Sequence, residues 1–142
     1  MSKGAFPLEI LATLVCDDIR REQNGKDILI GVYGGDILVE RFPAPLPLAI
    51  YVQLAPKVTG PIALEFRLVM DGRQTLAEGA LHLNIDSLGP PAALPLNGVL
   101  ALVPQPGTLG IQIRAPGSGW KTLRTISIRQ GGPPGAAAPP PP

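Results

Sequence analysis

The sequence predicts an all-β fold, an antiparallel β-sandwich of about eight or nine short strands followed by a disordered C-terminal tail. Apolar and polar residues alternate with a period of two along most of the chain, and no stretch keeps a helical period. The 18 Pro and 17 Gly residues interrupt these runs at intervals of about ten residues. Hydrophobic residues make up 45% of the 142 residues, which is enough for a packed core.

The strands expected in the first half share this alternation. They span residues 8–16, 28–32, 37–40, 50–54 and 62–70. Cys16 falls on the same face of the first strand as Ile10 and Leu14, and Ile28 shares a face with Ile30 and Val32. Segment 42–47 carries three prolines, which lack a backbone donor, so we expect an extended crossing between sheets there. The only helical structure considered is a single turn at 17–23.

In the second half, Asp71-Gly72 predicts a tight turn between strands at 62–70 and 75–85, because glycine accepts positive φ. The proline-rich segment 86–97 is expected to be a loop. Further strands are expected at 99–103, 108–114 and 120–129, with a bulge between Leu123 and Ile126, where the alternation slips.

The C-terminal segment 131–142, GGPPGAAAPPPP, has too few apolar side chains to offset chain entropy. Residues 1–130 are therefore expected to form the folded domain and residues 131–142 a disordered tail. Because Arg129 is the only basic residue near it, we expect this tail to be a spacer rather than a ligand of polyproline-binding domains.

Charge and composition disfavour several partner classes. The chain has 12 basic and 11 acidic residues, a formal net charge of +1, so no field of one sign attracts nucleic acid or an anionic membrane. No apolar run reaches the ~20 residues that a membrane-spanning helix needs. Glu9 and Val15 disfavour a lipoprotein signal ending at Cys16, and a single cysteine forms no internal disulfide. We therefore expect a cytoplasmic protein.

Segment 16–33, CDDIRREQNGKDILIGVY, resembles the opening of a family of small uncharacterised bacterial proteins. The matching positions are Cys16, Asp17, Asp18, Arg20, Glu22, Gly25, Lys26, Leu29, Ile30, Gly31 and Tyr33. FPAPLP at 42–47 and the sequence PGT at 106–108 are also similar to that family. The resemblance, specific over about the first third of the chain, implies an immunoglobulin-like β-sandwich in a domain of unknown function and brings no activity. Leu109 stands where the family has an aromatic residue, and the Pro-rich tail is outside the family pattern.

Cys16 and His82 are the residues considered for catalysis. A reactive cysteine needs a nearby base or cation, but the strand alternation directs Cys16 inward, where we expect an inert core residue. His82 is expected on an outer face with Glu78, and no G-x-S-x-G motif presents Ser87 or Ser118 to it. One histidine and one cysteine do not make a usual zinc site. We therefore expect no catalytic residue, cofactor site or metal site, and the protein is not expected to be an enzyme.

The candidate interaction surface is a cluster of charged residues: Asp17, Asp18, Arg20, Arg21 and Glu22. Interleaved arginines argue against a calcium site. The cluster is either a solvated connection held by its own ion pairs or a protein-binding surface. The glycines at 31–35 are expected in a hairpin turn rather than a phosphate loop, because no helix follows them.

We predict a non-enzymatic structural or protein-interaction module with an unknown protein partner, and the oligomeric state is left open. The alternative is a small-ligand or carbohydrate-binding β-sandwich. Sugar sites present aromatic platforms, for which Tyr51 and Trp120 are the expected outward-facing residues.

Overall fold

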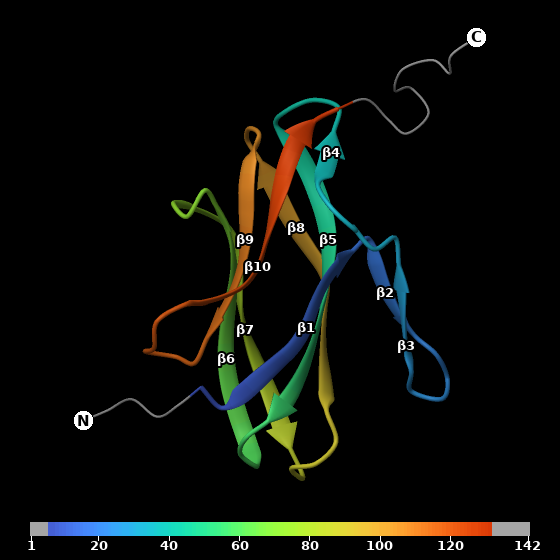
Figure 1. The fold of residues 1–142 in the computed structure, drawn as a ribbon, viewed down its shortest axis with the longest axis vertical. Coiled ribbons are helices and arrows are strands. Elements are labelled where there is room, and N and C mark those ends of the chain that lie inside the picture. Colours follow the sequence, from blue (N-terminus) through green and yellow to red (C-terminus); the bar gives the residue numbers. More distant parts are fainter. Residues whose placement is uncertain (1–5, 132–142) are drawn as a thin grey trace.

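The computed structural model describes residues 6–131, which form ten β-strands and no helix (Figure 1). In chain order the strands are β1 (Leu8–Cys16), β2 (Asp18–Arg21), β3 (Asp27–Ile30), β4 (Ile37–Val39), β5 (Ala44–Pro56), β6 (Gly60–Met70), β7 (Gln74–Ile85), β8 (Ala92–Val103), β9 (Gly107–Arg114) and β10 (Lys121–Gln130). The all-β prediction is confirmed. The predicted tail lies outside the described residues except for Gly131, and no helix of residues 6–131 could span a membrane.

The strands form two large sheets and one hairpin. One sheet has the order β1-β5-β8, the other has the order β4-β10-β9-β6-β7, and β2 pairs only with β3. Neighbouring strands are antiparallel except β4 and β10, which are parallel. The five-stranded sheet curls as a half-barrel, and the β2–β3 hairpin lies to one side of the body (Figure 1).

Buried aliphatic side chains from both large sheets form one core. Its fully buried large side chains include Leu8, Leu48, Ile50, Leu54, Leu64, Leu68, Leu109, Ile111, Ile113 and Ile128. The expected turn between β6 and β7 is confirmed, because Asp71 and Gly72 have φ values of 52° and 68°. The last strand does contain a bulge, but its register shift lies between Thr122 and Arg124, slightly before the expected position between Leu123 and Ile126.

The expected crossing at 42–47 is wrong for residues 44–47, which belong to β5. Residues 44–48 pair with β8 on one side, while β1 pairs with β5 only from Ala49 onward. Pro45 and Pro47 therefore lie where one edge of β5 is unpaired, and a missing backbone donor on that edge removes no ladder hydrogen bond.

The expected loop at 86–97 is wrong for its second half. Residues 92–96 pair with β5 as the first part of β8, and Pro95 lies opposite Tyr51. The register shifts at Asn97 and Gly98, where Gly98 has a φ of 70°. β8 is the edge of its sheet, which is why a strand interrupted by a proline and a bulge is tolerated there.

Candidate functional site

The charge cluster forms a β-hairpin rather than the helical turn considered at 17–23. Asp18–Arg21 is strand β2, and it pairs with β3 in the register Arg21 to Asp27 and Arg20 to Ile28. The Glu22 N–H donates to the Lys26 carbonyl at 2.8 Å and closes the turn. The five candidate residues are therefore consecutive with β2: Asp17 precedes it, Asp18, Arg20 and Arg21 lie in it, and Glu22 follows it at the turn.

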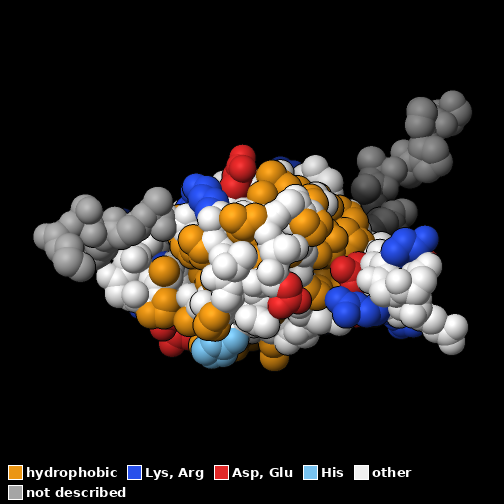
Figure 2. Space-filling view, turned by 90° about the horizontal axis from the view of Figure 1, so that it is seen from below, with side chains coloured by type: hydrophobic (Ala, Val, Ile, Leu, Met, Phe, Trp, Pro, Cys, Tyr) orange, Lys and Arg blue, Asp and Glu red, His pale blue; other side chains and the backbone are white. Residues whose placement is uncertain are grey.

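Each cation of the hairpin has a carboxylate partner. Arg20 Nε lies 3.0 Å from Asp18 Oδ2, Arg21 Nε lies 3.4 Å from Asp27 Oδ1, and Lys26 Nζ lies 3.7 Å from a Glu22 carboxylate oxygen. Hydrogen bonding from Arg20, followed by that from Asn97, holds the pKa of the Asp18 carboxyl below its usual range. Figure 2 shows Lys and Arg near Asp and Glu at this end of the molecule, on the right, and hydrophobic side chains over the middle of the same face.

The pair Arg21–Asp27 differs from Arg20–Asp18 in burial. The Asp27 side chain is only 10% exposed, whereas that of Asp18 is 38% exposed. Arg21 joins the two strands of the hairpin, while Arg20 pairs within its own strand.

A second, smaller hydrophobic cluster holds the hairpin on the outer side of the three-stranded sheet. Cys16, Ile19 and Ala49 are buried in it, with Leu29 and Tyr51 packed around them. We call this the hairpin cluster. Tyr51, expected to face outward, lies on the outer face of β5, since its neighbours Ile50 and Val52 point into the main core, and it is half-buried against the hairpin cluster.

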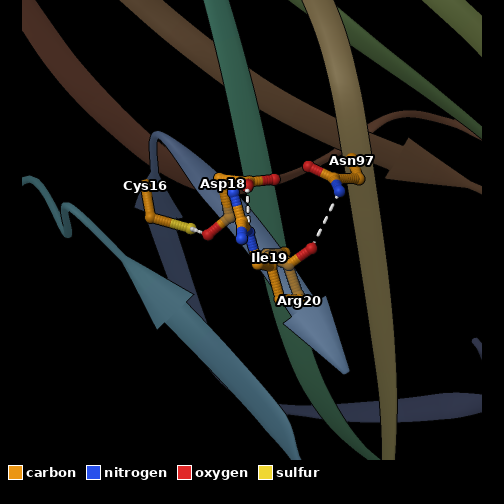
Figure 3. A network of polar contacts seen from close by, with 5 residues as sticks. All are labelled: Cys16, Asp18, Ile19, Arg20 and Asn97. Carbon is orange, nitrogen blue, oxygen red and sulfur yellow. Dashed lines mark hydrogen bonds and ion pairs between the residues drawn. The ribbon is translucent and has the colours of Figure 1, made fainter. Parts of the chain in front are cut away.

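Polar contacts complete the attachment of the hairpin (Figure 3). Asn97, from the bulge of β8, donates from Nδ2 to the Ile19 carbonyl at 2.9 Å. The Cys16 thiol donates to the Asp18 carbonyl at 3.5 Å. Both contacts occupy backbone carbonyls of β2, a strand that has only β3 as a sheet neighbour.

Cys16 is buried as predicted, but not on the predicted face. The register of β1 against β5 shifts between Ile10 and Ala12, so the alternation changes sides. Val15 consequently lies in the main core and Cys16 in the hairpin cluster. Burial raises the pKa of the Cys16 thiol, which disfavours the reactive thiolate.

The loop after β3 crosses to a different sheet, so the hairpin turn expected at 31–35 is wrong: β3 pairs with β2, and β4 pairs with β10. Gly31 has a φ of 69°, and a Cβ there would overlap the Asp17 carboxylate. Tyr33 donates from its hydroxyl to Asp17 Oδ1 at 2.9 Å. Burial, together with the hydrogen bond and charge of Asp17, raises the pKa of Tyr33 to about 12.

Three aliphatic side chains are exposed in and just after β3. Ile28, Ile30 and Val32 are 41%, 40% and 47% exposed, and we call them the β3 stripe. Ile28 and Ile30 share one face of the strand, as predicted, and this face is open to solvent. The residue between them, Leu29, packs inward against the hairpin cluster. Sequence reasoning missed the stripe as a candidate surface because β3 is aliphatic at successive positions, so alternation did not identify its covered face.

His82 is exposed on β7, as predicted. Among residues 6–131, no three His, Cys, Asp or Glu side chains are grouped to hold a metal ion. Trp120 is half-buried against two arginines of the five-stranded sheet, Arg67 and Arg114.

The fold and this surface define a small all-β protein with a charged hairpin attached to its three-stranded sheet. Comparison with protein-family models and with curated proteins gives no match.

Proposed function

We propose that this chain is a non-enzymatic, immunoglobulin-like module of the cytoplasm that binds an extended segment of a partner protein along β3. It would belong to the bacterial family that segment 16–33 resembles, with neither nucleic acid nor membrane as partner. The strand order of two facing sheets supports the immunoglobulin-like assignment. The observation that carries the binding proposal is the β3 stripe, three neighbouring aliphatic side chains left open to solvent.

The backbone of β3 supports an extended partner. Within the described residues, β3 pairs only with β2, so its other edge has no strand neighbour. Alternate residues of such an edge direct N–H and C=O groups outward, and an added strand would satisfy them. Side chains of the added strand on the stripe's face would cover Ile28 and Ile30, while Arg20, opposite Ile28, would border them.

Site-specific photo-crosslinking in host cells tests the proposal. A photoreactive residue is introduced at position 30 of the full chain, in place of Ile30. The matched control carries it at position 100, in place of Leu100, an aliphatic residue of β8 whose exposed fraction is 60%. Discrete protein adducts are expected from position 30 and not from position 100. The absence of adducts at position 30, or the same adducts at both positions, would overturn the proposal.

The two arginines separate binding from folding. Arg20→Ala should reduce the adduct yield at position 30 and leave the thermal midpoint unchanged, because its partner Asp18 is well solvated. Arg21→Ala should lower stability by about 1 kcal/mol, because it leaves the largely buried Asp27 side chain without its cross-strand cation. If both variants retain full adduct yield, the charge cluster is a solvated connection and takes no part in binding.

A further inference from the structure

The outer face of the five-stranded sheet holds one tryptophan in a defined position. Trp120 precedes β10, and its ring centroid lies 4.3 Å from Cζ of Arg67 and 4.2 Å from Cζ of Arg114. Arg67 also donates to Gln112 Oε1 at 2.7 Å, and Arg114 donates to Glu65 Oε1 at 2.8 Å. Each guanidinium group is held in place by a hydrogen bond to a neighbouring strand, so its cation–π contact with Trp120 fixes the position of the indole ring.

A trough of about 300 Å³ lies beside this ring, a volume at the lower end of small-molecule sites. Its lining residues come from β6, β7, β9 and the segment before β10: Glu65, Phe66, Glu78, Gly79, Ala80, Arg114 and Trp120. A Cβ at Gly79 would lie 2.6 Å from Phe66 Cε1, so the ring occupies space that a side chain at this position would need.

The charges around the trough select the class of ligand. Glu65 and Glu78 are balanced by Arg67 and Arg114, so the site has no net charge. An anion would meet two carboxylates, and a cation would meet an indole ring already stacked with two guanidinium groups. A neutral ligand with one apolar face and several hydroxyls avoids both penalties.

We propose that the trough beside Trp120 binds a neutral saccharide of one or two rings. The C–H face of a sugar ring would stack on the indole, and its hydroxyls would donate to Glu78 and accept from Arg114. Within residues 6–131 Glu78 makes no ion pair and is exposed, so its carboxylate is able to accept these hydrogen bonds. The site is independent of the protein binding proposed for β3.

Titration of the full chain with sugars tests this proposal. Trp120 is the only tryptophan, so intrinsic fluorescence reports on this trough alone. The probes are neutral disaccharides (maltose, cellobiose, lactose and chitobiose), with glucuronic acid and glucosamine as charged controls. We expect a saturable change in Trp120 emission with at least one neutral disaccharide, with a dissociation constant of about 1 mM. The charged controls should bind more weakly.

Substitution assigns the binding to the trough. Glu78→Gln keeps the shape of an exposed side chain, so the thermal midpoint should be unchanged while affinity falls about tenfold. Glu9→Gln, an exposed glutamate of β1 on the other sheet, is the matched control and should bind as the wild type does. The proposal is overturned if no neutral sugar gives a saturable change, if a charged control binds best, or if Glu78→Gln and Glu9→Gln bind alike.

Discussion

Replacing Ile19 by alanine should release the hairpin from the three-stranded sheet. Ile19 is 7% exposed at the centre of the hairpin cluster, beside Cys16 and Ala49. The substitution removes three carbon atoms, and at about 0.8 kcal/mol for each buried carbon it costs about 2.4 kcal/mol. The hairpin cluster is separate from the main core, so this cost should appear first in local opening of the hairpin.

Labelling of the Cys16 thiol measures that opening directly. Cys16 is fully buried beneath the hairpin and is the only cysteine, so a thiol reagent reaches it only when the hairpin opens. A loss of about 2.4 kcal/mol raises the population of the open state, and hence the labelling rate, about 50-fold. The rate is followed by mass spectrometry under native conditions, and urea unfolding measures the global free energy in parallel.

Ile28→Ala is the matched control, because it removes the same atoms from the exposed face of the same hairpin. Its unfolding free energy should change by no more than about 0.5 kcal/mol. If Cys16 in the Ile19→Ala variant were labelled no faster than in the wild type, the hairpin cluster would not be what protects Cys16. Equal acceleration in both variants would refute the assignment of Ile28 to the open face.

Two further variants test the loop after β3 and the contact between β6 and β7. Because the pKa of Tyr33 is raised from 10 to about 12, the wild type should lose stability as the pH rises from 10 to 12. Tyr33→Phe should lack this loss. If the thermal midpoints of both proteins fell equally between pH 10 and pH 12, burial and Asp17 would not be what raises the pKa of Tyr33. Gly79→Ala should cost about 1–3 kcal/mol in urea unfolding, since its Cβ meets the Phe66 ring. Gly34→Ala, where nothing lies within 4 Å, should change stability little, and equal losses would refute the clash.

Much of the fold was predictable wherever one face of a strand is covered and the other is solvated. In β6, Leu64 and Leu68 are buried while Glu65 and Arg67 lie outside, as the alternation predicts. The Asp71-Gly72 turn was predictable because glycine accepts the positive φ that a tight turn requires. Local chemistry was sufficient at these positions.

Other features depend on which strand lies alongside, and alternation carries no such information. Pro45 and Pro47 are compatible with β5 only because β1 does not reach that part of the strand. In β1 a bulge between Ile10 and Ala12 moves Cys16 to the opposite face, and no proline or glycine marks it. Both errors follow from pairing across the sheet rather than from local preference.

The candidate surface was half predictable for the same reason. The concentration of charged residues at 17–22 marked this segment as a candidate surface, but the hairpin that it forms with β3 was not expected. The contact of Trp120 with Arg67 and Arg114 could not be predicted from the sequence. Arg67 and Arg114 are neighbours only because β6 pairs with β9, a pairing that joins residues far apart in the sequence, such as Glu65 and Arg114.

The two proposed sites lie on different elements, which makes them separable by experiment. The hairpin packs on β5 and β8, whereas the trough is formed by β6, β7, β9 and Trp120. Substitutions at sites that share no contacts are usually additive within about 0.5 kcal/mol. Glu78→Gln should therefore leave crosslinking at position 30 intact, and Arg20→Ala should leave the sugar titration unchanged. A coupled loss would point instead to a change in the main core, to which both large sheets contribute.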